Sequence, residues 1–311
     1  MRKKKDYLFL FLKGIGMGAA DVIPGVSGGT IAFISGIYEE LINSIKSINF
    51  TTLKLLFTGK VGAFFNAVNA WFLLSVFGGI AVSIFSLAQL MKWLLTNHPI
   101  PVWSFFFGLI LVSAVFIIRS SDKFKVRGWI AFISGILVSF FITSVSPVNT
   151  PEALWFVFLS GSIGICAMIL PGISGAFILL LLGKYLYIMT AVTELNLLVI
   201  MVFVAGAATG IILFSNLLSW LLKYYHTVTI ALLAGFMIGS LNKVWPWKIV
   251  ETWAQNSHGE MVAITERNVL PATYSDISGH DSFLAIAIAL FLVGIFLLIA
   301  IETIGAKMKR S

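Results

Sequence analysis

The sequence predicts an all-α polytopic membrane protein with two inverted-topology repeats, each a re-entrant broken helical hairpin followed by three transmembrane helices. Composition gives the class: 59% of the 311 residues are hydrophobic and 11% are charged. The mean hydropathy of +1.00 lies outside the range of soluble domains. A short motif of proline, glycine and serine interrupts two apolar segments at related positions, which predicts the repeat.

Six apolar runs predict full spans, because about 20 helical residues cross the hydrocarbon core. The runs cover residues 71–95, 102–118, 128–145, 197–222, 229–241 with its flank, and 283–301. The basic and apolar N-terminus resembles a signal peptide, but Lys13 interrupts its apolar part. We therefore expect this segment to be retained.

The repeated motif is Pro-Gly-x-Ser-Gly, at residues 24–28 and again at residues 171–175. Matching glycine and tyrosine residues follow each copy, and a second constant offset relates the spans downstream. The predicted division is repeat 1 (1–150: hairpin about 8–45, amphipathic linker 46–70, three spans) and repeat 2 (151–311: hairpin about 153–192, three spans, outer loop 245–281).

The distribution of Lys and Arg predicts the topology, because cytoplasmic loops collect basic residues. Both termini, the linker at 46–70 and the loop at 119–127 are basic, whereas the loops at 96–101 and 146–151 contain no Lys or Arg. Both termini are thus expected to be cytoplasmic. Three spans per copy is an odd number, so the copies have opposite orientations, an arrangement typical of transporters.

Two connecting segments have their own signals. Residues 48–69 intersperse Phe and Leu with Lys, which predicts an amphipathic helix on the inner membrane surface. The outer loop at 245–281 is acidic, and a lid, a docking surface and a solvated connector all remain open for it.

Each break is expected to present backbone donors inside the membrane. Proline ends the descending arm, glycine permits the turn, and serine suits the N-cap of the returning arm. The first amides of that arm lack intrahelical partners, so this helix end attracts an anion. The alternative is that the turns only pack the hairpin tips together. The predicted anion-binding residues are Ser27, Gly28, Gly29, Thr30, Ser174, Gly175 and Ala176.

Three ionisable residues are candidates for further roles. Asp21, three residues before the first break, is expected to couple transport to a proton or cation, or else to cap the arm or pair with Lys13 or Lys184. Lys184 is expected to attract an anionic headgroup, unless it extends to the surface. Glu39 is a second coupling candidate, with a solvated position as its alternative.

We expect no catalytic residue, no cofactor and no metal site. The four histidines lie in loops or at span ends without metal-ligand spacing, and Cys166 lies in an apolar segment, where a core role is expected. The net charge of +8 resides mainly at the termini and in short loops. It therefore indicates membrane orientation and no nucleic-acid partner.

The segments KGIGMGAADVIPGVSGGTIAFISGIYEEL (13–41) and LPGISGAFILLLLGKY (170–185) resemble the bacterial polyprenyl-phosphate transporter family, the undecaprenyl phosphate translocases. The resemblance covers nearly the whole chain. It implies a flippase that returns undecaprenyl phosphate, the lipid carrier of cell-wall precursors, from the outer to the inner leaflet of the plasma membrane. Polyprenyl phosphate and membrane lipids are the implied partners; a coupling proton or cation and a homodimer remain open.

Two alternatives accompany this interpretation. Bacterial undecaprenyl-pyrophosphate phosphatases also look like inverted repeats with re-entrant Pro-Gly-x-Ser turns, but there an arginine follows the serine. Gly28 and Gly175 occupy those places here, and neither broken segment contains an arginine, so phosphoryl chemistry lacks its charge stabiliser. A transporter of small anions or of ion-coupled solutes is the other alternative.

Overall fold

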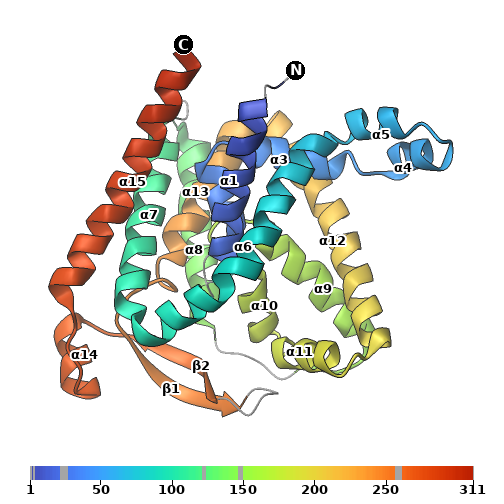
Figure 1. The fold of residues 1–311 in the computed structure, drawn as a ribbon. Coiled ribbons are helices and arrows are strands. Elements are labelled where there is room, and N and C mark those ends of the chain that lie inside the picture. The colour runs from blue at the N-terminus through green and yellow to red at the C-terminus, as the bar shows by residue number, and fades with distance from the viewer. Residues whose placement is uncertain are drawn as a thin grey trace. The chain divides into compact units, whose positions relative to one another are not determined.

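The computed structural model describes residues 2, 4–21, 27–120, 124–145, 150–255 and 261–310, which are mostly helical (Figure 1). The helices are α1 (Lys4–Asp21), α2 (Gly28–Ile34), α3 (Tyr38–Lys46), α4 (Phe50–Phe57), α5 (Val61–Ala67), α6 (Ala70–Asn97), α7 (Pro99–Ser120), α8 (Val126–Ser144), α9 (Leu154–Ile169), α10 (Gly175–Leu181), α11 (Tyr185–Thr193), α12 (Leu197–Tyr224), α13 (His226–Ser240), α14 (Pro271–Ser278) and α15 (Leu284–Arg310). The strands are β1 (Lys248–Gln255) and β2 (Met261–Asn268).

The helices identify a multi-pass membrane protein. Within the described residues, α6, α7, α8 and α12 are long and apolar enough to span a bilayer, and the bent pair α10–α11 raises the number of candidates from 4 to 5. All six predicted spans coincide with helices. However, α13 has only 15 residues, which is shorter than a full span.

Each predicted hairpin consists of one long helix followed by two short ones. α1 precedes α2 and α3, and α9 precedes α10 and α11. Residues 22–26, which include Pro24 and Gly25 of the first motif, lie outside the described residues. The two short helices of each hairpin end at Lys46 and Thr193, close to the expected limits of about 45 and 192, but each returning arm is divided because the chain turns at Gly36 (φ +70°) and Gly183 (φ +61°). The bend between α10 and α11 is 110°.

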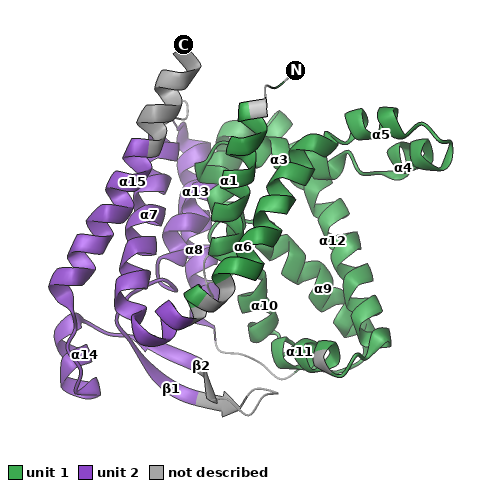
Figure 2. Ribbon diagram, viewed as in Figure 1, with its two compact units in different colours: residues 1–91, 148–230 green, residues 92–147, 231–311 purple. Residues whose placement is uncertain are grey.

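The chain forms two compact units (Figure 2). Unit 1 contains residues 1–91 and 148–230, and unit 2 contains residues 92–147 and 231–311. Each unit therefore combines corresponding parts of the two sequence repeats. Unit 1 holds both broken segments together with the first span of each repeat, whereas unit 2 holds most of the remaining spans.

Within unit 1, two helix pairs pack through equivalent glycines. A Cβ added to Gly14 of α1 would overlap the Val76 carbonyl of α6, and a Cβ added to Gly161 of α9 would overlap the Phe203 carbonyl of α12. Gly14 and Gly161 occupy the same place in the two aligned segments. Small residues allow membrane helices to approach closely, so both pairs depend on glycine at these positions.

Unit 2 packs α7 against α15 and α8 against α13, again through glycines such as Gly108 and Gly135. The outer loop, expected at 245–281, folds into an antiparallel β1–β2 hairpin and α14. This hairpin is a local departure from an all-helical fold. Its base is fixed by a buried cluster of Ile100, Trp247 and Ala287.

The linker also differs from its prediction. The single amphipathic helix expected over 48–69 is divided into α4 and α5, because the chain turns at Gly59 (φ +72°). No residue of either helix is buried, and Phe50 and Phe57 are among the most exposed apolar side chains. This exposure fits the expected place of the segment at a membrane surface.

Candidate functional site

The first break (residues 22–27) ends in an N-cap at Ser27, as the sequence predicts. Ser27 has extended backbone angles, and its Oγ accepts a hydrogen bond from the Gly29 amide at 3.0 Å. The same hydroxyl donates to the Met168 carbonyl at 2.8 Å. The Ser27 side chain therefore caps α2 and also ties it to the end of α9.

Asp21 acts as a second cap at the first break. Its Oδ1 accepts a hydrogen bond from the Gly28 amide at 2.7 Å. Gly28 has no room for a side chain here, since a Cβ would lie 2.5 Å from Asp21 Oδ2. The Asp21 carboxylate therefore accepts the Gly28 amide of α2, which the sequence analysis had expected to bind an external anion. This position matches the capping alternative for Asp21.

The two broken segments meet inside unit 1. Thr30 Oγ1 accepts a hydrogen bond from the Gly172 amide at 2.8 Å, while Ser27 bonds to Met168. A Cβ on Gly29 would overlap the Ile169 carbonyl, so α2 lies directly against the end of α9. The predicted set Ser27–Thr30 is therefore brought together with residues 168–172 of the second segment.

The second break (residues 170–174) leaves its helix end without a side-chain cap. Ser174 is buried at the N-cap of α10, but its side chain accepts no amide of that helix. Among the described residues, no hydrogen bond uses the Gly175 or Ala176 amide as a donor. The residue aligned with Asp21 is Met168, which brings no carboxylate to this end. Hence the α10 end retains the donors that the α2 end has used.

Lys184 lies away from the second break. α10 has 7 residues, about 10 Å of helix, and Lys184 follows its opposite end. The side chain is buried, its Nζ donates to the Thr150 carbonyl at 2.9 Å, and the Phe156 and Tyr187 rings lie within 5.7 Å. Lys184 thus does not join Ser174, Gly175 and Ala176 in one cluster.

Glu39 lies on α3, where its Oε1 contacts His226 Nε2 at 2.8 Å. Both side chains are about half exposed, which matches the solvated alternative for Glu39. The neighbouring Glu40 receives two hydrogen bonds from Arg2 and one from Asn69. Burial opposes ionisation of Glu40, but these bonds and the Arg2 charge lower its pKa below the usual value. This network was not predicted, because it joins residues far apart in the sequence.

The titratable groups of the described residues offer little for metal binding. No group of three or more His, Cys, Asp or Glu side chains among them could hold a metal ion. Cys166 is half-buried, and its Sγ lies 3.6 Å from the Gly210 carbonyl.

Lys13 Nζ donates to the Ser35 carbonyl at 2.6 Å, at the C-terminal end of α2.

Paired helix breaks that meet within a bundle of apolar helices define a class of multi-pass membrane transporters. The comparisons with known proteins are specific. A family model described as VCA0040-like, undecaprenyl phosphate translocase-like, matches residues 17–262, so the chain belongs to this family.

Two named relatives agree with this assignment. The chain is 44% identical over 305 residues to a polyprenyl-phosphate transporter of Vibrio cholerae, with 98% of this chain and 99% of the relative covered. It is 34% identical over 253 residues to a polyprenyl-phosphate transporter of Staphylococcus aureus, with 76% and 85% covered. No solved structure matches the chain significantly.

Proposed function

We propose that this protein is a flippase for polyprenyl phosphate that returns undecaprenyl phosphate from the outer to the inner leaflet of the bacterial plasma membrane. The family assignment and the two named relatives support this substrate class. The direction of transport and the reuse of the lipid carrier in cell-wall synthesis are implied by the resemblance to the polyprenyl-phosphate transporter family. Transport without hydrolysis is supported by the glycines after Ser27 and Ser174, where the resembling phosphatases carry arginine.

The proposed architecture is a pair of inverted repeats with cytoplasmic termini. The distribution of basic residues supports it, and so does the equivalent packing of Gly14 and Gly161 in the two copies. Inverted copies would carry the two breaks in from opposite faces of the membrane.

The lipid phosphate is proposed to bind at the N-terminal end of α10. The observation that carries this proposal is the difference between the two breaks: α2 is capped by Asp21 and Ser27, whereas Ser174 caps no amide of α10. The Gly175 and Ala176 amides and the Ser174 hydroxyl would then bind the phosphate oxygens. Ser27, Gly28, Gly29 and Thr30 would support this site by holding the two segments together.

Asp21 is the proposed coupling residue. Its carboxylate lies in the same group of contacts as the second break, because Gly28 and Ser27 link it to Met168. A bound phosphate and an ionised carboxylate repel each other, so a proton or cation on Asp21 would favour lipid binding. Glu39, which lies at the surface with His226, is a secondary candidate.

Native mass spectrometry with purified protein would test the site. The ligands are undecaprenyl phosphate, undecaprenyl pyrophosphate and phosphatidylglycerol. We expect wild type to prefer the monophosphate. Ser174→Ala should weaken its binding at least about tenfold, since a hydrogen bond to a charged group contributes roughly 1.5–3 kcal/mol.

Ser160→Ala is the matched control. Ser160 is a buried serine of α9 whose hydroxyl donates to the Phe156 carbonyl of its own helix. Equal binding by wild type and Ser174→Ala would leave the Ser174 hydroxyl without a ligand role. Cleavage of undecaprenyl pyrophosphate by the purified protein would favour a phosphatase over a transporter.

A further inference from the structure

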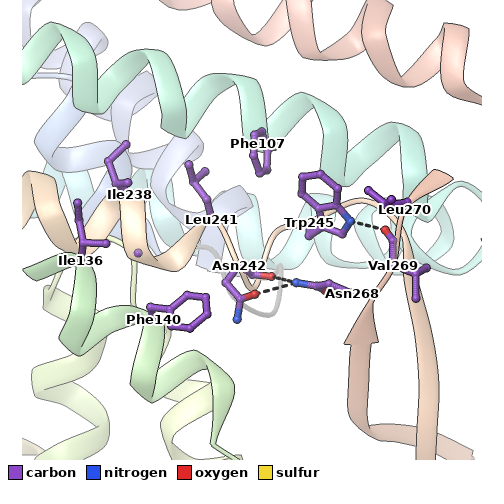
Figure 3. Close-up of a pocket in the computed structure, with 11 residues that line it drawn as sticks. Phe107, Ile136, Phe140, Ile238, Leu241, Asn242, Trp245, Asn268, Val269 and Leu270 are labelled. Carbon is purple, nitrogen blue, oxygen red and sulfur yellow. Dashed lines mark hydrogen bonds between the residues drawn. The ribbon is translucent and has the colours of Figure 1, made fainter. Parts of the chain in front are cut away.

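Two apolar regions of the described residues are open to the surroundings of the protein, and they differ in charge. The first is a cavity of about 450 Å³ in unit 2, surrounded by side chains from α7, α8, α13, the turn after α13, and β2 (Figure 3). None of the described residues that line it is charged, and Asn268 Nδ2 donates to Asn242 Oδ1 at 2.9 Å across its rim. This neutral lining, whose amides bond to each other, indicates no particular ligand.

The second region is the α4–α5 pair, residues 50–67, which belongs to unit 1. The two helices pack mainly against each other, and neither of them buries a residue. Figure 2 shows the pair projecting from the other helices of unit 1. Phe50 and Phe57 are 86% and 89% exposed. Exposed apolar patches of this kind mark contact surfaces for a protein or a membrane.

The apolar side chains of α4 share one side of the helix with a lysine. Phe50, Leu53 and Phe57 are three and four residues apart, which places them along one helix face. Lys54 follows Phe50 by four residues and therefore lies beside the same face. Thr51, one residue after Phe50, points to a different side. A lysine in this position can lay its apolar stem on the aromatic surface and keep its ammonium in a polar layer.

The α4–α5 pair and its flanks carry positive charge without negative charge. Between Glu40 and Asp122 the sequence has no Asp or Glu, whereas Lys46, Lys54 and Lys60 lie in or beside the pair. Lys54 and Lys60 are exposed, and neither pairs with a carboxylate among the described residues. Exposed charges of one sign attract a surface of the opposite sign. The partner of this surface is therefore expected to be anionic.

Both ends of the pair are fixed to α3, so its orientation is defined within unit 1. Thr52 Oγ1 donates to the Ser47 carbonyl at 2.7 Å, just after α3 ends. Asn69 Nδ2 donates to Glu40 Oε1 at 2.8 Å. These bonds hold the pair at a set place beside the bundle.

That place is the end of a candidate membrane span. α6 begins at Ala70, directly after the pair, and is long and apolar enough to cross a bilayer. The ring of Trp71 on α6 contacts the Phe65 ring of α5, with ring centres 6.0 Å apart. Tryptophan is enriched where the hydrocarbon core meets the headgroups. The pair therefore lies at the depth expected for lipid headgroups.

We propose that the α4–α5 pair lies flat in the headgroup layer of the membrane and binds anionic phospholipids there. Phe50, Leu53 and Phe57 insert toward the acyl chains, while Lys54 and Lys60 contact the phosphates. Both lysines are exposed rather than enclosed, so they fit a layer of headgroups better than a single bound molecule. This inference goes beyond the proposed function and does not depend on which lipid is transported.

Photo-crosslinking of the full-length protein in proteoliposomes tests the inference. The vesicles contain phosphatidylcholine with a minor fraction of phosphatidylglycerol, and a photoreactive benzoylphenylalanine replaces either Phe57 or Thr51. Adducts are identified by mass spectrometry. At Phe57 we expect lipid adducts in which phosphatidylglycerol exceeds its share of the bilayer. At Thr51, which is exposed on a different side of α4, we expect few lipid adducts.

Three variants in the Phe57 crosslinking background separate charge from apolar contact. Lys54→Gln should lower the preference for phosphatidylglycerol about fivefold, the effect of one basic residue near an anionic surface, and Lys54→Arg should retain it. Arg267→Gln is the matched control, because it removes an exposed cation that pairs with Glu251 in the β1–β2 hairpin. No residue of the α4–α5 pair is buried, so the variants should fold, and melting temperatures verify this.

Three outcomes would overturn the proposal. Crosslinks from Phe57 to a second copy of the chain would make the pair a protein interface. Phospholipid adducts in proportion to the bilayer composition would exclude selection by charge, and equal lipid adducts at Phe57 and Thr51 would exclude the proposed orientation. Binding of undecaprenyl phosphate to Ser174→Ala is a separate measurement, so the phosphate site at α10 can fail while the lipid contact of the α4–α5 pair stands.

Discussion

The two helix breaks have the same motif but different electrostatic environments. At the first break, Asp21 and Ser27 bind the Gly28 and Gly29 amides, so the helix end is already satisfied. At the second break, Ser174 caps no amide, and Met168 stands where the first copy has its aspartate. The Asp21 to Met168 difference accounts for one of the two missing caps, whereas the serines are identical in sequence and differ only in what they bond to.

This difference indicates how a duplicated element can take two roles. The first copy uses its serine and threonine to bond to the second copy at Met168 and Gly172. The second copy supplies carbonyl and amide groups to those bonds, and within the described part of the chain its own serine caps no amide of α10. Under the proposed function, the first break supports and the second break binds.

The largest expected effect comes from Gly29→Ala. A Cβ there would overlap the Ile169 carbonyl, and overpacking costs about 1–3 kcal/mol, or roughly 2–5 °C in melting temperature for a chain of this size. Thermal unfolding in detergent measures the change. Ala176→Gly is the control from the second copy, because Ala176 already carries a Cβ and is exposed. Similar shifts for both variants would mean that the breaks do not differ in packing.

Met168→Asp should convert the second break into a copy of the first. Met168 is close to α10, since its Cβ lies 3.2 Å from the position of a Cβ on Gly175. A carboxylate there would occupy the amides and repel phosphate, which should weaken undecaprenyl phosphate binding at least tenfold, about 1.4 kcal/mol. Met168→Asn controls for shape. Equal losses for Asp and Asn would exclude charge as the cause.

Local features of the breaks were predictable from the sequence. The N-cap at Ser27 follows from serine before a helical run, and the spans follow from apolar length, because both depend on neighbouring residues. The repeat alignment also identified Met168 as the counterpart of Asp21. It could not show that the Met168 carbonyl accepts the Ser27 hydroxyl, because this contact joins residues 141 positions apart.

Other features depended on packing that composition does not encode. The sequence places Lys184 only ten residues after Ser174, which suggested a basic residue near the anion site. In the structure α10 separates the two residues, and Lys184 at the far end of this helix bonds to the Thr150 carbonyl. The split of the returning arms follows from positive φ angles at Gly36 and Gly183, residues that the repeat alignment matched without predicting a turn. The cavity of unit 2 is lined by helices from both repeats, so no single segment of the sequence predicts it.

Ser27→Ala and Ser174→Ala should separate stability from binding. Ser27→Ala removes a helix cap and leaves the Met168 carbonyl without its donor, which we expect to cost about 1 kcal/mol and a few degrees of melting temperature. Ser174→Ala removes no hydrogen bond seen among the described residues, so its melting temperature should equal that of wild type. A clear loss of stability in Ser174→Ala would show that this serine is structural as well.

The smallest expected effect concerns the ion pair between Arg2 and Glu40 of α3, which the second copy lacks because Tyr187 aligns with Glu40. Glu40→Gln removes the pair with Arg2, whose side chain is 36% exposed, so we expect a loss of about 0.2–1 kcal/mol. The pKa of Glu40 is lowered in the folded protein, so this stabilisation is present above about pH 4.5, the unfolded value, and disappears as pH falls through the folded pKa.

Melting temperatures of wild type and Glu40→Gln should therefore differ at pH 7 and converge as the pH falls below about 4.5 and through the lowered pKa of Glu40. Glu39→Gln is the control, since Glu39 and His226 are both about half exposed and contribute less. A difference in melting temperature that persists at low pH would not come from the charge of Glu40. It would instead be assigned to a weaker hydrogen bond from Asn69 to the glutamine side chain than to Glu40. Convergence would show that the Arg2–Glu40 pair stabilises the first copy only while Glu40 is charged. The break of the same copy is instead held by the Ser27 and Thr30 hydroxyls and by the Asp21 carboxylate that caps α2.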